Sequence, residues 1–527
     1  MSQPTQIHAL SATQLLAALE ARALSSVEIV EALLARIDAV EPAVHAFVEV
    51  FREESRQQAA LADAARARGI TLGPLHGLPL TVKENIATRG SDQTLGIRSR
   101  KGKPAAEDAP VVKVLKDCGG IVLGKTNVPL LLLSMESNND LFGTTANPWD
   151  TRRAPGGSSG GEGAAIATGG SPLGIGTDIG GSIRIPSAWC GVPGLKPTWG
   201  RWSMGGSAGA MPGQEVIKSQ MGPMARTVGD LVLAMRAVSP ERQRPYDPLV
   251  PPIPWGEPSA LPLQGLRVGY YEADDVFPPA ASVRRAVRES AEALAAAGAE
   301  LIPFTPPNNV ELVELYFAAV SADGGRTIDL SMGEQDFTPQ LQTLVRIARL
   351  PTPVRVLAGQ LMGLRGERRV ARQLSVLGEK SVAELWRLAA RRTALQRAEA
   401  AAWTAAGFDL LLAPPTVTPA ALLGETGDWS LGAWHTMRYN VLDLPAGVVP
   451  VSRVRADETT RPAPADRLEK KAARFEQGSA GLPVCVQVVG RPWEEDKVLG
   501  LMLHLERLLR DRPEYPTTPI DPRAERI

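Results

Sequence analysis

Apolar positions along the chain follow two periods that alternate from one end to the other. Near the start, Val27, Val30 and Leu34 recur at three- and four-residue intervals, the spacing of one face of a helix. Ser25 or Ser26 can cap this helix. Further along, short apolar runs bounded by Gly, Pro or Asn predict buried strands. The pattern predicts helices over residues 11–22, 26–42, 51–67, 109–118, 282–297 and 494–509, and strands over 78–82, 121–123, 266–270, 300–304, 408–412 and 483–489.

The order of these elements predicts the fold class. Strands alternating with helices are typical of an α/β protein with a large mixed, mostly parallel β-sheet covered by helices on both faces. With 527 residues, 44% of them hydrophobic, the chain can bury a core of that size. The proline-rich residues 240–262 predict an extended connection, residues 309–403 a mostly helical region, and the charge-rich residues 453–480 a solvated insertion.

Charge and cysteine content narrow the class of function. The 57 basic and 57 acidic residues balance, so the surface gives no electrostatic basis for binding nucleic acid or an anionic membrane. The three cysteines are widely spaced without a CxxC pair, which argues against a disulfide framework or zinc and favours a reducing compartment. Because no window is apolar enough to cross a membrane and no signal peptide is apparent, we expect a cytoplasmic protein that acts on a small molecule.

Two islands of Gly and Ser, Gly156–Gly163 and Gly176–Ser182, carry the candidate chemistry. Glycine lets a backbone turn several N–H groups toward one point, and each island places a serine at its edge. Such donor clusters serve two chemistries, because they cradle phosphate or stabilise an oxyanion beside a nucleophilic serine. The islands by themselves leave both open.

A nucleotide site is one alternative, because Gly119–Thr126 matches the phosphate-loop pattern GxxxxGK[ST]. In a phosphate loop this pattern follows a strand, and its variable positions form the loop. Here it follows a predicted helix, and Ile121, Val122 and Leu123 fill those positions. The context therefore disfavours nucleotide binding.

Lys83 ends the apolar run over 78–82 and is a second ambiguous signal. Taken alone, it fits a surface lysine whose stem lies along the protein better than a buried one. The five histidines are isolated, without HxH or HxxxH spacing, so each is more simply a structural or solvent-facing residue. Spacing does not test for a histidine-based triad, because triad partners are distant in sequence.

The Gly/Ser islands and their surroundings resemble the signature of the amidase signature family of serine hydrolases. The resemblance rests on Pro155–Gly161, Gly176–Pro186 and Gly191–Thr198, and on further motifs in the family's order, Leu80–Asn85, Gly124–Asn127, Phe142–Gly143, Asn147–Trp149, Gly222–Arg226 and Gly481–Val484. It implies a single amidase domain over 1–527. Within it, 1–70 would form N-terminal helices, 71–235 the signature core, 236–400 a variable, mainly helical region that shapes the substrate site, and 401–527 the C-terminal part of the sheet and the last helix.

The resemblance also implies roles for individual residues. Ser182 matches the nucleophile, Ser158 the bridging serine that follows a cis Gly–Ser peptide, and Lys83 the base, which reverses the surface interpretation of that lysine. The chemistry is coherent, since a serine hydroxyl needs a base within hydrogen-bond reach and a buried lysine with a lowered pKa can serve. The implied oxyanion hole consists of the backbone N–H groups of Ile179, Gly180, Gly181 and Ser182, and the implied supporting residues are Ser159, Thr177, Asp178 and Arg184.

Within the family, Ser158–Gly163, Gly170–Gly176 and Asn127–Leu130 resemble the fatty acid amide hydrolase branch more than the glutamine-dependent tRNA amidotransferase branch. The sequence predicts no N-terminal membrane span of the kind found in fatty acid amide hydrolases, so we expect long-chain lipid substrates to be disfavoured. We therefore expect a monomeric or homodimeric hydrolase that cleaves hydrophobic amides, with esters and aryl carbamates as further candidates, and that uses no metal or organic cofactor. Alternatives are an amidotransferase A-type subunit that supplies ammonia, a nucleotide-binding protein using Gly119–Thr126, and a non-catalytic binding protein.

Apolar side chains in the segments expected to form the cavity favour uncharged, hydrophobic acyl or aryl groups. Any one of these side chains is more simply a core residue. The candidates are Met204, Met211, Leu312, Leu315, Phe317, Leu344 and Leu361.

Overall fold

The computed structural model describes residues 6–524, apart from the side chains of residues 340, 343 and 344. Its N-terminal helices begin where the sequence predicts. Ser11 caps α1 (Ala12–Glu20) and Ser25 caps α2 (Ser26–Val44). In both helices the side chain of the third residue bonds back to the backbone of the cap, so two amide groups that a helix end leaves free are satisfied reciprocally.

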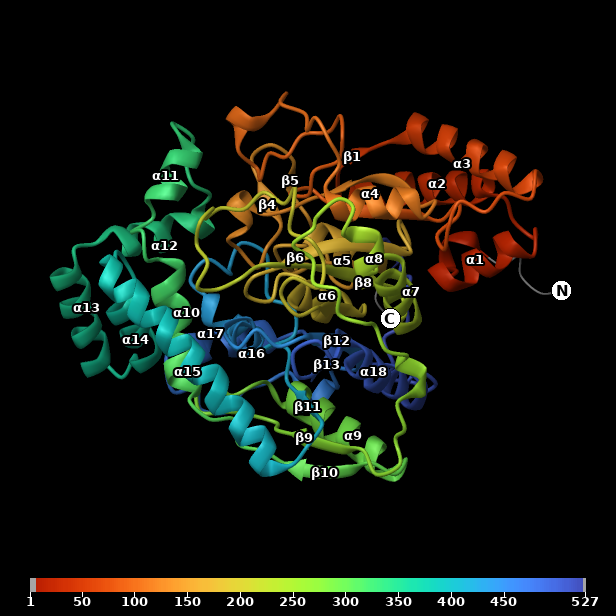
Figure 1. Ribbon diagram of the computed structural model, residues 1–527. Helices are drawn as coiled ribbons and strands as arrows, with labels where there is room; N and C mark the ends of the chain where they lie inside the picture. Colours follow the sequence, from red (N-terminus) through yellow and green to blue (C-terminus); the bar gives the residue numbers. More distant parts are fainter. Residues whose placement is uncertain (1–5, 525–527) are drawn as a thin grey trace.

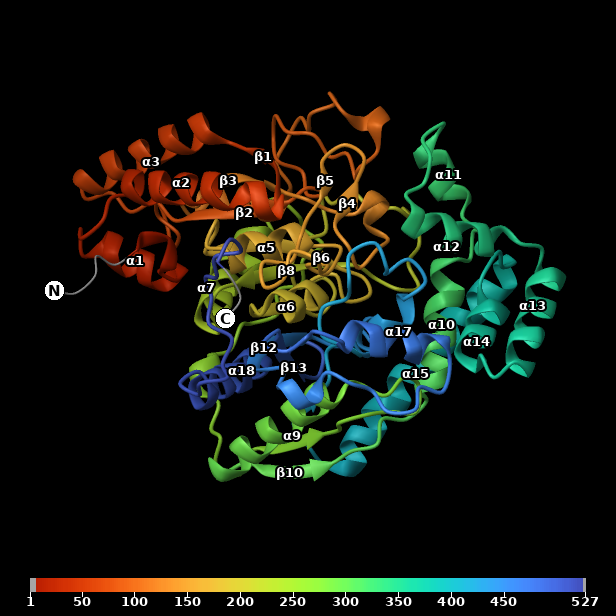
Figure 2. The same ribbon diagram turned by 180° about the vertical axis from the view of Figure 1, so that it is seen from behind.

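A sheet of eleven strands within the described residues organises the molecule (Figures 1 and 2). In spatial order the strands are β1 (Phe47–Val50), β3 (Ile121–Thr126), β2 (Pro79–Lys83), β6 (Leu173–Asp178), β8 (Gln220–Ala225), β7 (Gly194–Lys196), β12 (Ala446–Arg453), β13 (Pro483–Val489), β11 (Leu410–Ala413), β9 (Arg267–Tyr270) and β10 (Glu300–Pro303). A separate two-stranded sheet pairs β4 (Asn138–Asn139) with β5 (Gly143–Thr144).

The α/β class and the mixed sheet are confirmed, but the expectation of a mostly parallel sheet is wrong. Of the neighbouring pairs in the described sheet, β2–β3, β2–β6, β9–β10 and β9–β11 run parallel, and the remaining six run antiparallel. Helix α6 (Arg184–Cys190) connects β6 to β7, but the later strand β8 lies between these two and is antiparallel to both. Alternation of strands and helices along the chain does not reveal a later strand inserted in this way.

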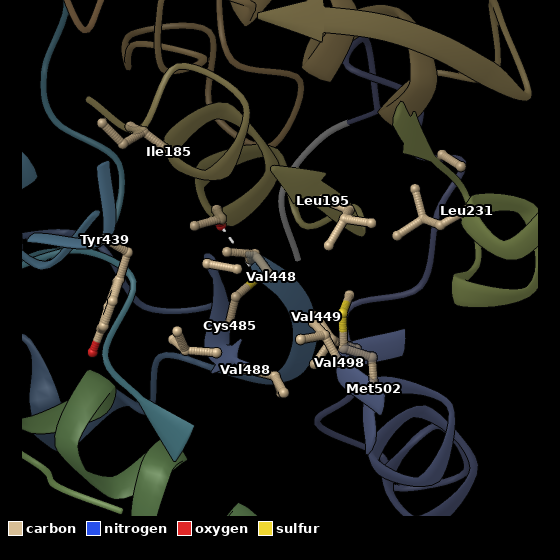
Figure 3. Packing of buried hydrophobic residues seen from close by; sticks show 14 of the residues in the cluster. Ile185, Leu195, Leu231, Tyr439, Val448, Val449, Cys485, Val488, Val498 and Met502 are labelled. Carbon is tan, nitrogen blue, oxygen red and sulfur yellow. Dashed lines mark hydrogen bonds between the residues drawn. The ribbon is translucent and has the colours of Figure 1, made fainter. Parts of the chain in front are cut away.

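Helices cover both faces of the central strands. On one face α6 contacts α5 (Gly160–Ala167), and on the other α18 (Glu495–Leu509) contacts α7 (Val228–Ala237) and α9 (Ala281–Ala296) (Figure 3). In Figure 3, Ile185 of α6 and Val498 of α18 lie on opposite sides of Val448 in β12. These layers exclude water from the middle of the sheet.

Two helical regions flank the sheet on opposite sides in Figure 1. The N-terminal helices α1 to α3 lie on one flank, near β1. The predicted helical region over 309–403 is confirmed on the other flank. It consists of α10 (Asn309–Val320), α11 (Arg326–Met332), α12 (Pro339–Arg349), α13 (Thr352–Leu364), α14 (Arg368–Val376) and α15 (Val382–Ala406). The remaining helices are α3 (Arg52–Ala67), α4 (Pro110–Asp117), α8 (Pro240–Gln243), α16 (Trp434–Val441) and α17 (Arg467–Glu476).

The fold agrees with one expectation from sequence, that Gly119–Thr126 is not a phosphate loop, and corrects another, on residues 453–480. The pattern Gly119–Thr126 is no phosphate loop, because its last six residues form the buried strand β3 and the Lys125 Nζ donates to the carbonyl of Asp92 at 2.6 Å. The region 453–480 is not simply a solvated insertion, because α17 buries Leu468 and Phe475 against the core. In both cases tertiary packing buries side chains, Lys125 in the first and Leu468 and Phe475 in the second, whose burial could not be predicted from local composition.

The described helices include none long and apolar enough to span a bilayer. The three cysteines, Cys118, Cys190 and Cys485, are buried free thiols. The cellular compartment stays a prediction from cysteine usage.

Glycine at position 161 in α5 permits the close approach of two other backbone segments. A Cβ on Gly161 would lie 2.4 Å from the Asn127 nitrogen and 2.7 Å from the Ala46 carbonyl oxygen. Because backbone atoms block that space, we expect Gly161→Ala to lower the free energy of unfolding by about 1–3 kcal/mol, measured by urea titration.

The helical glycine Gly229 in α7 is the matched control. The atom nearest to a Cβ on Gly229 would be the Thr227 hydroxyl oxygen, at an ordinary contact distance of 3.7 Å. Gly229→Ala should raise the free energy of unfolding by up to about 1 kcal/mol, because alanine favours a helix. If both variants had the same stability, the close approach at Gly161 would be contradicted.

Candidate active site

Lys83 is the last residue of β2 and is fully buried. Its Nζ donates to the Ser158 Oγ at 2.7 Å, to the Thr177 Oγ1 at 2.9 Å and, more weakly, to the Thr177 carbonyl at 3.4 Å. β2 and β6 are parallel neighbours, so the ends of the two strands bring Lys83 and Thr177 together. The surface interpretation of this lysine is therefore wrong.

Ser158 lies in the loop that leads into α5. The Gly157–Ser158 peptide is cis, and Ser158 is 1% exposed. A Cβ on Gly157 would lie 2.3 Å from the Ser134 carbonyl oxygen, so this loop is pressed against the neighbouring segment. Ser159, the next residue, is buried and its hydroxyl donates to the Thr177 carbonyl at 3.4 Å.

Ser182 ends the turn that follows β6. The backbone N–H of Ser159 donates to the Ser182 carbonyl at 3.1 Å, so the two Gly/Ser islands lie side by side. Gly181 adopts φ +122°, which side chains rarely tolerate, and a Cβ there would lie 2.1 Å from the Thr436 hydroxyl. The tight turn thus leaves Ser182 partly exposed at the wall of a cavity.

The four backbone N–H groups of the predicted oxyanion hole are not equivalent. The N–H of Gly181 already donates to the Asp178 Oδ1 at 2.8 Å. Among the described residues, no acceptor is hydrogen-bonded to the N–H groups of Ile179, Gly180 or Ser182. Three of the four predicted donors are therefore free to bind a ligand oxygen.

Asp178 and Arg184 form a fully buried ion pair that fixes this turn. The Arg184 guanidinium donates twice to the Asp178 carboxylate, at 3.0 Å each. It also donates to Gln487 of β13 at 2.8 Å and to Asn440 of α16 at 2.6 Å. Burial would raise the pKa of Asp178, but the guanidinium of Arg184 holds it well below its usual range. The pair therefore ties the turn to two C-terminal elements.

Burial shifts the pKa values of Lys83 and Glu162. Desolvation lowers the pKa of Lys83 to about 7, against the opposing effect of the carboxylates of Asp178, Glu162 and Glu84. Desolvation also raises the pKa of Glu162 to about 8, although Thr81 donates a hydrogen bond to it at 2.6 Å. Lys83 is therefore poised to exist as a neutral amine near neutral pH.

An apolar cavity opens beside Ser182. Helices α10, α11 and α12 supply much of its wall, together with the turn that carries Ser182. Its lining includes no charged side chain among the described residues. The apolar part includes Ile185, Met211, Phe317, Ile328, Val345 and Leu377, and the polar edge includes Ser134, Thr426 and Ser430. Such a lining suits an uncharged, hydrophobic ligand.

The cavity residues expected from sequence are only partly correct. Met211 and Phe317 line the cavity. Met204, Leu312 and Leu315 pack in the core instead, and Leu361 is 50% exposed on α13. The seventh candidate, residue 344, is not among the side chains that the structure describes.

Sequence reasoning missed the loop that closes the polar edge of the cavity. The buried carboxylate of Glu136 accepts hydrogen bonds from the N–H of Gly424 at 2.8 Å, and from the N–H and hydroxyl of Thr426 at 2.9 and 2.7 Å. The sequence signal for this loop is Glu136 itself, a lone acidic residue directly after the mostly apolar segment 128–135. Tyr316 also lines the cavity. The sequence gives no signal for it, because it lies among the apolar residues of a helix.

Among the described residues, no group of three or more His, Cys, Asp or Glu side chains could hold a metal ion. The reactive groups that the fold does gather are hydroxyls and one amine, arranged beside free backbone donors. Hydroxyls, a buried amine and free backbone donors are the groups that an acyl-transferring hydrolase with a serine nucleophile would need.

Comparison with known proteins identifies the family. A family model described as Amidase matches residues 28–499, and the chain belongs to this family of amide hydrolases. It is 42% identical to fatty-acid amide hydrolase 1 of Sus scrofa over 83% of this chain and 76% of that protein. It is 32% identical to a glutamyl-tRNA(Gln) amidotransferase chain of Chloroflexus aggregans over 94% and 95% of the two chains. A solved fatty acid amide hydrolase structure superposes with a TM-score of 0.83 at 27% identity, over 96% and 86% of the chains.

The buried ion pair generates a stability prediction. Arg184→Met roughly preserves volume but leaves the Asp178 carboxylate buried without its cation. Leaving one member of a buried pair uncompensated costs about 3–5 kcal/mol, so the free energy of unfolding in urea should fall by that amount. Arg326→Met is the control, because its pair with Glu379 is largely exposed and should contribute little. Equal effects of the two substitutions would contradict this account.

Proposed function

We propose that this protein hydrolyses uncharged, hydrophobic amides, with anilides and aryl carbamates among its preferred substrates, through an acyl-enzyme on Ser182. The observation that carries the proposal is the buried 2.7 Å contact between the Lys83 Nζ and the Ser158 Oγ, in the loop that touches Ser182. The apolar cavity beside Ser182 and the family of amide hydrolases support the same conclusion.

In the proposed reaction, neutral Lys83 takes the proton of the Ser158 hydroxyl while Ser158 takes that of Ser182. The Ser182 oxygen then attacks the carbonyl carbon of the substrate. The charge that develops on the carbonyl oxygen is bound by the free N–H groups of the turn. Rigid backbone donors suit this task because they need no reorganisation as the charge appears.

Collapse of the tetrahedral intermediate breaks the C–N bond. Ser158 returns the proton from Lys83 to the leaving nitrogen, which departs as an amine and leaves the acyl group on Ser182. A water molecule then loses a proton through the same relay, attacks the ester carbon and releases the acid with Ser182 restored. Anilides and aryl carbamates need the returned proton least, because an aniline is a weak base.

Ser182 is the residue to which a covalent inhibitor should attach. We expect a fluorophosphonate to form one adduct on Ser182, located by peptide mass spectrometry. We expect Ser182→Ala to reduce hydrolysis to the background rate with an unchanged unfolding curve. An adduct on another serine, or an active alanine variant, would refute the proposed nucleophile.

Lys83 should impose an alkaline plateau on the pH profile. Because its pKa lies at about 7, the neutral base is depleted below that pH and populated above it. The value of kcat/KM should therefore rise through about pH 7 and then level off. Lys83→Arg and Lys83→Ala should both lose about 10²–10⁴-fold in kcat, since guanidinium stays protonated. The exposed Lys103→Arg is the control, and an active Lys83→Arg variant would exclude Lys83 as the base.

A substrate panel tests the proposed specificity. Burial of apolar ligand surface stabilises the complex by roughly 25 cal/mol per Å2, and the cavity lining includes no described charged residue to hold a free amino acid. Hydrophobic anilides or aryl carbamates should therefore show higher kcat/KM than glutamine, asparagine or acetamide. If glutamine were the best substrate, an amidotransferase-type function would replace this proposal.

A further inference from the structure

Tyr316 of α10 brings a phenol hydroxyl to the turn that carries Ser182. A Cβ on Gly180 would lie 2.3 Å from the hydroxyl oxygen of Tyr316, so the phenol lies directly against the α-carbon of that glycine. The ring is 7% exposed and packs edge-on against Phe317, with centroids 5.5 Å apart and planes at 86°. The Thr436 hydroxyl also donates to the Gly180 carbonyl at 2.8 Å. Hydroxyl and turn are thus both held in place.

The Tyr316 hydroxyl is also free. Tyr316 lines the cavity, and none of the described residues forms a hydrogen bond with its hydroxyl group. Of the hydroxyl groups on the cavity wall, only this one and that of Ser182 lack a hydrogen-bond partner among the described residues. The engaged ones are Ser134 with Thr426 at 3.3 Å, Ser321 with the Phe317 carbonyl at 2.7 Å, and Ser430 with Gln373 at 3.3 Å.

The same turn has one backbone donor fewer than the sequence predicts. The N–H of Gly181 is directed at Asp178, which leaves the N–H groups of Ile179, Gly180 and Ser182. A side-chain donor beside Gly180 would restore the missing hydrogen bond. Burial, reinforced by the negative charge of Asp178, raises the pKa of Tyr316, so the hydroxyl keeps its proton and remains a donor.

We propose that the Tyr316 hydroxyl is a further catalytic donor, which hydrogen-bonds to the substrate carbonyl oxygen as that oxygen becomes an oxyanion. The inference rests on the proposed function, because the oxyanion forms only when Ser182 attacks. A donor of this kind acts chiefly in the transition state, since negative charge on the oxygen strengthens the hydrogen bond. Its removal therefore lowers kcat and leaves KM nearly unchanged.

The test is Tyr316→Phe, which deletes the hydroxyl and keeps the ring that packs on Phe317. With an anilide substrate, kcat should fall on the order of 10²-fold at constant KM. An aryl trifluoromethyl ketone, whose adduct with Ser182 carries an oxyanion, should bind the variant weaker by a similar factor. A ligand with CH₂ in place of the carbonyl should bind wild type and variant equally.

Tyr271→Phe is the matched control. Tyr271 is buried, and its hydroxyl pairs with that of Tyr439 at 2.9 Å, outside the cavity lining. Its removal should leave kcat unchanged. If Tyr316→Phe kept full kcat and ketone affinity, or weakened the CH₂ ligand as much as the ketone, the inference would be overturned and the proposed function would stand. If wild type formed no ketone adduct, the proposed nucleophile itself would fail and this inference with it.

Discussion

The site depends on one buried ion pair, Asp178 with Arg184. The carboxylate of Asp178 accepts hydrogen bonds from the N–H groups of Gly181 and Ile183, at 2.8 and 3.1 Å. These bonds fix the conformation of the turn. The guanidinium extends the same network to β13 and α16. Isolated charges are costly to bury, and this pair is satisfied on nearly every side. The position of Ser182 is therefore set by electrostatics that span both halves of the sheet.

Burial disfavours the charged form of Lys83 as it does that of Asp178, but no directly paired opposite charge offsets it. Lys83 has hydroxyl and carbonyl partners instead of a directly paired carboxylate, so desolvation dominates and its pKa falls to about 7. One sheet thus keeps Asp178 charged and lets Lys83, at the end of the neighbouring strand, become neutral. Asp178 and Lys83 are equally buried, so their different partners explain why Asp178 stays charged whereas Lys83 can accept a proton.

The cavity joins this core to the helical flank. Residues from α10 to α12 supply its far wall, whereas the turn at Ser182 and the loop held by Glu136 supply the near wall. Proteins with fatty-acid amide hydrolase and amidotransferase names align with this chain over most of its length. The flank supplies much of the apolar wall, and its helix α10 also places Tyr316 against Gly180 of the turn.

The sequence by itself determined the α/β class, the helices at both ends of the chain and the strands β2, β3, β9, β10, β11 and β13, because caps and apolar periodicity are local signals. It missed the central strands β6, β7, β8 and β12, and the roles of Lys83, Ser158 and Ser182 came from the family resemblance. Only the tertiary structure decided that Lys83 is buried, that the strand after Gly120 continues through the buried Lys125 to Thr126, and that the sheet is mainly antiparallel. It also decided that Gly181 gives its N–H to Asp178 and that Glu136 and Tyr316 belong to the site. These features arise from contacts between residues distant in sequence, and a pattern confined to neighbouring positions carries no record of them.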